Sequence, residues 1–146
     1  MIQYYITGTR RGLGKALADK YGNCNSLEEC DVFINCKHDG FEQVELLYKA
    51  ASLNKRIINI GSYASDFTLK YKYAIEKKAL REANGHLFVN GKETTCINFG
   101  YIDTESQEGK DVEKMPVSEA VEIIDWILNQ QNRVKEITIT PKVKYG

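Results

Sequence analysis

The sequence lacks an excess of charge of either sign. Its 146 residues include 20 lysines and arginines against 20 aspartates and glutamates, so the formal net charge at pH 7 is zero. Proteins that bind nucleic acid or an anionic membrane surface through their overall field carry a basic excess. We therefore expect no nucleic acid and no membrane among the partners, and we expect any bound anion to be recognised locally.

The sequence also lacks a long apolar run, a linker and an internal repeat. No stretch approaches the roughly 20 apolar residues that cross a bilayer, and the first motif begins at residue 7. We therefore expect no targeting or anchoring segment and a cytoplasmic protein. No tract rich in proline, glycine or serine divides the chain, and 146 residues with 42% hydrophobic composition match one compact α/β domain. We expect a single domain over residues 1–146.

Patterns for metals and disulfides are scarce as well. The chain has four cysteines but no Cys-x-x-Cys pair, and it has only two histidines. Structural zinc sites use closely spaced pairs of these residues. We therefore interpret the cysteines as reduced thiols rather than as zinc ligands or disulfides, and we expect no metal. The residues concerned are Cys24, Cys30, Cys36, Cys96, His38 and His86.

The most informative motif is Thr7-Gly8-Thr9-Arg10-Arg11-Gly12-Leu13-Gly14. It follows the apolar run 2–6 and leads into the helical pattern 15–20, so it lies at a junction between a strand and a helix. Glycines at such a junction let the backbone turn tightly and approach a pyrophosphate, which then meets the free N–H groups at the start of the helix. We expect a loop that binds an anion, and the alternative is an ordinary glycine turn.

Apolar, β-branched runs alternate with amphipathic segments along the rest of the chain. The predicted strands are 2–7, 31–36, 56–60, 94–98 and 136–140, and the predicted helices are 13–21, 41–54, 70–84 and 118–129, the last with Ser118 as its N-cap. This alternation predicts an α/β fold with a doubly wound, Rossmann-like parallel sheet of about five to six strands. We expect right-handed crossovers, helices on both faces and a ligand at the carboxyl ends of the strands.

Tyr73 and Lys77 are four residues apart on a predicted helix and are therefore neighbours on one helical face. Such a pair arises about once by chance in a chain of this composition, so its position matters more than its presence. The helix follows a strand that ends near Ser62, and all three side chains are expected at the carboxyl edge of the sheet. The alternatives are a cap at the strand end for Ser62 and an exposed helical face for the pair.

The glycine loop, the serine and the Tyr-x-x-x-Lys helix, in this order, resemble the short-chain dehydrogenase/reductase family, of which this chain is an unusually short example. Segment 31–36 is similar to the family strand that ends in Asn-Asn-Ala-Gly. Segment 100–104 is similar to the Pro-Gly-x-x-x-Thr segment beside the nicotinamide. The resemblance covers nearly the whole chain and implies an NAD(P)(H)-dependent oxidoreductase that transfers hydride between the nicotinamide and a small-molecule carbonyl or alcohol.

The resemblance also implies roles for single residues. Tyr73 would be the acid/base, Lys77 would lower the pKa of the phenol and hold the nicotinamide ribose, and Ser62 would orient the substrate oxygen. The residues implied to contact the cofactor are Gly8, Arg10, Arg11, Gly12, Leu13, Gly14, Asn35, Tyr73, Lys77, Gly100, Ile102 and Thr104.

The chain departs from the family between Gly14 and Asp31, which only sixteen residues separate. The family places further strands and helices there, and a crossover needs a dozen or more residues. We therefore expect a sheet that is trimmed on its adenosine side, with segment 23–25 as a vestigial strand. Cys36 and Phe99 stand where the family has asparagine and proline, and Gln43 is the nearest match for its helical asparagine.

Two functions stay open from the sequence. An oxidoreductase is favoured because Ser62, Tyr73 and Lys77 occur together, and a protein that only senses a dinucleotide has no need of an acid/base pair. A non-catalytic dinucleotide-binding or regulatory protein of the same fold is favoured by the missing adenosine-side elements. In either case we expect a homo-oligomer, a dimer or tetramer, because helices 41–54 and 70–84 carry apolar residues on more than one face and the matching family helices pack against a second copy.

Arg10 and Arg11 predict that NADP(H) binds more tightly than NAD(H), although NAD(H) binding is possible. A guanidinium suits a 2′-phosphate, whereas NAD-preferring sites offer a carboxylate about twenty residues after the loop. Asp31 has roughly that spacing but begins a strand. We expect Arg11→Ala to lower the NADPH/NADH affinity ratio, measured by cofactor fluorescence, by clearly more than about twofold. A ratio within about twofold of the wild-type value would show that Arg11 does not bind the 2′-phosphate.

Overall fold

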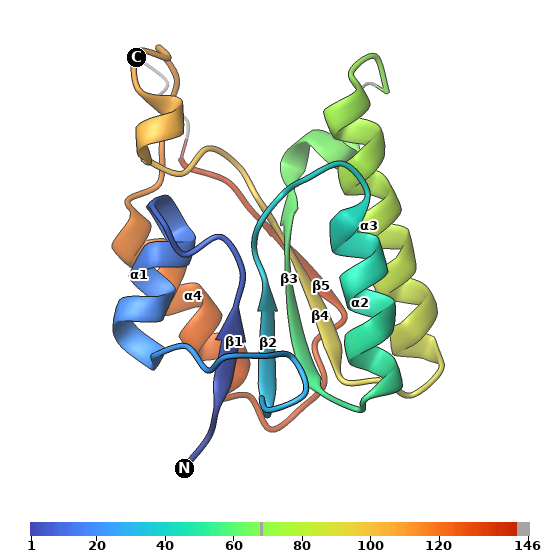
Figure 1. Ribbon diagram of the computed structural model, residues 1–146. Coiled ribbons are helices and arrows are strands. Elements are labelled where there is room, and N and C mark those ends of the chain that lie inside the picture. Colours follow the sequence, from blue (N-terminus) through green and yellow to red (C-terminus); the bar gives the residue numbers. More distant parts are fainter. Residues whose placement is uncertain (68, 143–146) are drawn as a thin grey trace.

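A computed structural model describes residues 1–67 and 69–142, and in these residues five parallel strands form one sheet between two pairs of helices (Figure 1). The strands lie in the order β1-β2-β3-β4-β5. They are β1 (Tyr4–Ile6), β2 (Val32–Asn35), β3 (Arg56–Ser62), β4 (Thr94–Phe99) and β5 (Glu136–Ile139). The doubly wound, Rossmann-like parallel sheet predicted from the sequence is confirmed.

Helices α1 and α4 cover one face of the sheet, and α2 and α3 cover the other (Figure 1). They are α1 (Gly12–Tyr21), α2 (Glu42–Ser52), α3 (Lys72–Val89) and α4 (Val117–Leu128), with short 3-10 helices η1 (Tyr63–Asp66) and η2 (Glu105–Gln107). The largest difference from the sequence prediction is that α3 continues to Val89 instead of Asn84, because Leu87 is buried against the core of its face. In the part of the chain that is described, no helix is both long and apolar enough to cross a membrane.

The prediction that Ser118 is the N-cap of α4 is wrong. The helix begins one residue earlier, at Val117, with Pro116 as its N-cap residue. The carbonyl oxygen of Pro116 accepts the N–H groups of Glu119 and Ala120 at 3.0 and 3.3 Å. The proline ring holds its own φ at −57°, a value that fits the approach to a helix. Ser118 therefore lies inside the first turn.

The strand order and the helix positions together determine the hand of the crossovers. Each connection moves one strand further in the same direction across the sheet. Two such connections have the same hand only if their helices lie on the same face. Because α1 and α4 lie on one face and α2 and α3 on the other, two of these four crossovers are left-handed. The prediction of right-handed crossovers throughout is therefore wrong for one pair of helices.

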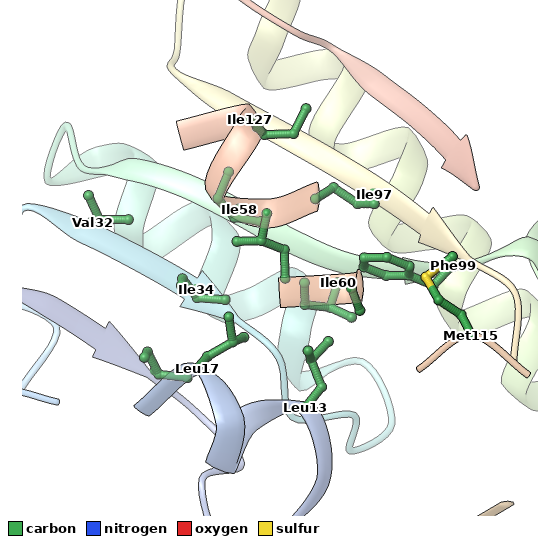
Figure 2. Packing of buried hydrophobic residues seen from close by; sticks show 13 residues of the cluster. Leu13, Leu17, Val32, Ile34, Ile58, Ile60, Ile97, Phe99, Met115 and Ile127 are labelled. Atoms are coloured by element: carbon green, nitrogen blue, oxygen red, sulfur yellow. The ribbon is translucent and has the colours of Figure 1, made fainter. Parts of the chain in front are cut away.

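Burial of its apolar stripe holds α1 on the face that it shares with α4. Leu13 and Leu17 are 7% and 0% exposed, and Figure 2 shows them pointing toward the side chains of Ile60 and Ile34 in the sheet. Full burial of an aliphatic side chain contributes roughly 1.5–3 kcal/mol, so α1 is firmly attached to this face. Residues of β2 and β4 are buried on both faces, as the continuous apolar runs of these strands indicate.

The side chain of Asn23 covers the outer edge of β1, where the sheet ends. Its Oδ1 accepts the N–H of Ile6 at 2.9 Å, and its Nδ2 donates to the carbonyl oxygen of Ile6 at 3.1 Å. The N–H of Cys24 donates to the carbonyl oxygen of Tyr4 at 2.8 Å. Segment 23–25 forms no strand, so the expectation of a vestigial strand is wrong. It satisfies the edge of β1 with one amide side chain and one backbone group instead.

We expect Asn23→Ala to lower the free energy of unfolding by about 1–2 kcal/mol, because both backbone groups of Ile6 lose their partner. Asn25→Ala, at an exposed position two residues further on, is the matched control and should change it by less than about 0.5 kcal/mol. Urea unfolding of both variants measures the difference. Equal effects of the two substitutions would show that the amide of Asn23 does not stabilise the edge.

Candidate functional site

The loops that follow β1 and β2 lead to opposite faces of the sheet. The chain runs from β1 to α1 on one face and from β2 to α2 on the other, and the same divergence separates β3, which leads to α3, from β4, which leads to α4. In α/β proteins, ligands bind at the carboxyl ends of strands whose loops diverge in this way. The candidate site therefore lies along this edge of the sheet.

The glycine loop has a backbone that only glycine accommodates at three positions. A Cβ atom on Gly14 would lie 2.0 Å from the carbonyl oxygen of Gly8, so α1 packs directly against the end of β1. Gly8 and Gly12 have φ angles of +70° and +62°, in the left-handed region. The first turn of α1 has no side-chain cap, and Leu13 turns its side chain into the core. The loop can therefore offer backbone N–H groups to an anion.

Neighbouring loops close around the glycine loop. The Oγ1 atom of Thr7 accepts the N–H groups of Cys36 and Lys37, both at 3.0 Å, which joins the ends of β1 and β2. The Cγ2 atom of Thr104 lies 3.5 Å from the position of a Cβ on Gly12. Thr104 therefore lies against the start of α1, and the cofactor contacts of Gly100, Ile102 and Thr104 stay a prediction. Arg10 and Arg11 are exposed on the same loop.

The structure brings Ser62, Tyr73 and Lys77 together. Ser62 is the last residue of β3; its Oγ accepts the N–H of Ala64 at 3.1 Å, and it lies near enough to Tyr73 to lower the pKa of the phenol. Lys77 follows one turn after Tyr73 on α3, and its Nζ lies 5.7 Å from the centre of the Tyr73 ring. A hydroxyl, a phenol and an ammonium from two elements thus form one cluster.

The environment of Tyr73 favours the neutral phenol. Burial raises its pKa above the ordinary value of 10.0, the hydrogen bond from Ser62 lowers it, and Tyr101 raises it. Burial has the largest effect, so Tyr73 carries its proton at neutral pH. A protonated phenol beside a hydroxyl and an ammonium can donate a proton to an oxygen atom and then be stabilised as phenolate.

Lys77 is held in the interior by two acceptors. Its side chain is 3% exposed, and Nζ donates to Oε1 of Gln43 and to the carbonyl oxygen of Ile60, both at 2.9 Å. Burial lowers the pKa of the ammonium from 10.5 to about 8. Gln43 also donates from Nε2 to the carbonyl oxygens of Asn35 and Ile60. Gln43, the nearest sequence match for the family's helical asparagine, is therefore a direct partner of the lysine.

Asn35 is the predicted site residue whose side chain lies furthest from solvent. It is 0% exposed, and Nδ2 donates to the carbonyl oxygen of Gln43 at 2.8 Å and to Oδ1 of Asn59 at 3.0 Å. Asn59 in turn donates to Asn84 and Thr94. The side chain of Asn35 is therefore not accessible at the carboxyl edge of the sheet. It lies in a buried polar network and contacts Gln43.

Sequence reasoning missed this network and a second pair of side chains beside Tyr73. The ring of His38 lies 4.8 Å from the ring of Tyr73, and its Nε2 lies 3.8 Å from Oε2 of Glu76. The signal for the network is the asparagine within two apolar strands, Asn35 in β2 and Asn59 in β3, since a polar residue in a buried strand needs a partner. No sequence signal identifies His38 or Glu76, because their contact depends on how the loop after β2 meets α3.

The lowered pKa of Lys77 makes stability depend on pH. Between pH 8 and 10.5 the unfolded chain retains a proton that the folded protein has released, so raising the pH across this range favours folding. We expect the free energy of unfolding of wild type to rise relative to Lys77→Met by roughly 1–3 kcal/mol in this window. Urea unfolding at several pH values measures the difference in the free energy of unfolding between the two proteins. The contributions of titratable groups that both proteins share cancel in this difference. Parallel pH curves would contradict the burial of a titrating ammonium.

The comparisons with known proteins rest on structure alone. No protein-family model matches the chain, and no curated protein matches it in sequence. A short-chain dehydrogenase from Burkholderia cenocepacia J2315 in complex with NADP is 17% identical, with a TM-score of 0.69 over 94% of this chain and 87% of that one. An alcohol dehydrogenase from the archaeon Thermococcus sibiricus complexed with 5-hydroxy-NADP is 16% identical, with a TM-score of 0.74 over 99% and 100%.

A third solved structure is the 3-alpha-hydroxysteroid dehydrogenase from Pseudomonas sp. B-0831 complexed with NADH. It is 12% identical to this chain, with a TM-score of 0.62 over 94% of each chain. At these identities the likeness establishes the architecture, and the parallel sheet, the glycine loop and the order of the elements agree with it. The chain therefore has the fold of the short-chain dehydrogenases in a short form.

Proposed function

We propose that the protein is an NAD(P)(H)-dependent oxidoreductase that transfers hydride between a nicotinamide and a carbonyl or alcohol carbon. The observation that carries the proposal is the convergence of Ser62, Tyr73 and Lys77 at the sheet edge that also holds the glycine loop. The solved structures of similar fold contain NADP, 5-hydroxy-NADP and NADH, which supports a dinucleotide as the ligand.

The residues of the glycine loop fit a dinucleotide. The close approach of Gly14 to Gly8 leaves no room for a side chain, and the uncapped start of α1 offers N–H groups and the positive end of the helix dipole to a pyrophosphate. Arg10 and Arg11 would hold a 2′-phosphate, and we infer from this a preference for NADP(H). Gly100, Ile102 and Thr104 would line the nicotinamide end, and Asn35 would act through Gln43.

When bound, the dinucleotide supplies or accepts a hydride. In the reducing direction, Tyr73 donates its phenolic proton to the carbonyl oxygen as the carbon is reduced. The resulting phenolate is stabilised by the O–H of Ser62 and by the charge of Lys77. Two donors of the ammonium are used by Gln43 and Ile60, so its third donor is the one that would reach the nicotinamide ribose.

A second candidate is a dinucleotide-binding protein without catalysis. The observation in its favour is the end of the described sheet at β1, whose outer edge is covered by Asn23 where a larger protein of this fold continues its adenosine side. Loss of contacts at that end lowers affinity for the cofactor but leaves the acid/base cluster intact. Turnover measurements separate the two candidates.

Assembly stays a prediction. Helices α2 and α3 expose large apolar side chains, among them Tyr48, Ile75 and Val89, which are 41%, 43% and 73% exposed. Such side chains gain stability by burial against a second copy. We therefore propose a homo-oligomer that forms through these helices and acts on a small molecule.

We expect Tyr73→Phe to abolish turnover, with a loss of about 10²- to 10⁴-fold, because it removes the proton donor and keeps the ring. Cofactor affinity should not change. Lys77→Met should reduce both turnover and cofactor affinity, and Ser62→Ala should mainly reduce the rate. Tyr71→Phe is the matched control, since this exposed tyrosine directly precedes α3 and contributes no group to the cluster. NADPH oxidation with a panel of carbonyl compounds is the assay, and thermal unfolding verifies that each variant is folded.

A Tyr73→Phe protein that oxidises NADPH at the wild-type rate would eliminate the proposed acid. Binding of NADPH without turnover of any compound by the wild-type protein would favour the non-catalytic function instead.

A further inference from the structure

His38 belongs to the loop between β2 and α2, and its ring lies against side chains of α3. Its ring meets the ring of Tyr73 edge to face, with centroids 4.8 Å apart and an interplanar angle of 61°. Its Nε2 lies 3.8 Å from Oε2 of Glu76 on α3, and Gln43 on α2 raises its pKa. One imidazole thus lies against the proposed acid and beside the residue that precedes Lys77 in α3.

The partners of His38 are buried and incompletely satisfied. Glu76 is 7% exposed, and its Oε2 has no hydrogen-bond partner, nor has Nδ1 of His38, among the residues that the structure describes. A separation of 3.8 Å is too long for a hydrogen bond, so the carboxylate and the imidazole lie side by side without one. Glu76 therefore lies on one side of the imidazole and the ring of Tyr73 lies against it as well.

His38 is neutral at neutral pH. Burial lowers its pKa from 6.5 and the charge of Lys77 lowers it further, while Glu76, the hydrogen bond with Gln43, and Asp39 act in the opposite direction. A neutral ring packs against the ring of Tyr73, which is 45% exposed, without adding a second positive charge. The pKa of Tyr73 is then governed by burial, by Ser62 and by Tyr101.

We propose that His38 is a positioning residue that holds the ring of Tyr73 in place for proton transfer, through the edge-to-face contact of the two rings. The proposal rests on the proposed oxidoreductase function for its effect on turnover, but the contact itself is a property of the protein without substrate. Edge-to-face aromatic pairs add about 0.5–1.5 kcal/mol beyond area burial and prefer a defined orientation. Misplacement of a reacting group by about 1 Å can cost a hundredfold in rate.

The test compares three substitutions at His38 with one at the other histidine. His38→Ala removes the ring, His38→Leu fills the space without an aromatic edge, and His38→Phe retains the edge but no nitrogen. His86→Ala is the matched control, because His86, which lies on α3, is also beside a tyrosine, Tyr48, at 5.9 Å between centroids. We expect Ala and Leu to lower kcat by about ten- to a hundredfold with the KM for NADPH within about twofold, and Phe to recover most of that loss.

Nuclear magnetic resonance of protein labelled at the tyrosine Cζ atoms supplies a readout that needs no substrate. The Tyr73 signal is the one of nine that disappears in Tyr73→Phe. In His38→Ala and His38→Leu this signal should shift, because the aromatic ring that lies against Tyr73 is lost. His38→Phe should restore the shift, and His86→Ala should leave it unchanged.

Each outcome decides the proposal. An unchanged Tyr73 signal and an unchanged kcat in His38→Leu would overturn the proposal. This test remains valid even when His38→Ala does not fold. Equal losses in His38→Leu and His38→Phe would assign the effect to the imidazole nitrogens and overturn the role of the ring edge. If the wild-type protein turns over no substrate, the proposed function fails, and the Tyr73 signal alone then decides whether His38 positions the phenol.

Discussion

The buried ammonium of Lys77 is the interaction on which the candidate site depends. A charge that is 3% exposed is stable only if fixed acceptors replace water, and here Gln43 of α2 and the carbonyl oxygen of Ile60 in β3 do so. These contacts connect α3 to β3 and α2. Because Gln43 and Ile60 fix the position of Nζ, the positive charge of Lys77 lies at one defined place beside the Tyr73 ring.

The acceptors of Lys77 are themselves fixed by neighbours. Gln43 is bound at both ends of its amide, by Lys77 and by the carbonyl oxygens of Asn35 and Ile60, so its orientation has no freedom. Asn35 is held by Asn59, whose amide is bound by Asn84 and Thr94. Oδ1 of Asn35 has no partner among the described residues, but the other hydrogen bonds of this network favour a single arrangement, because breaking them leaves further donors or acceptors without a partner. The polar interior thus keeps the edge of the sheet in register with α3.

The opposite end of the site depends on backbone geometry rather than on side chains. Gly14 touches the carbonyl oxygen of Gly8, and this contact sets how close α1 lies to β1. The outer edge of β1 is satisfied by Asn23 and Cys24, so the short chain ends its described sheet there without an unpaired strand. A small protein can therefore retain the anion-binding loop while it omits the elements beyond it.

The sequence by itself determined the alternation of strands and helices, the strand-to-helix loop at Gly8–Gly14 and the approach of Ser62, Tyr73 and Lys77. These features depend on local periodicity and on the rule that parallel strands end at one edge. Tertiary structure alone decided the left-handed pair of crossovers, the burial of Asn35 and the contact of His38 with Tyr73 and Glu76. Each of these depends on which face of the sheet a helix occupies and on how separate loops meet. Such contacts join residues far apart in the chain, and they leave no periodic pattern in the sequence.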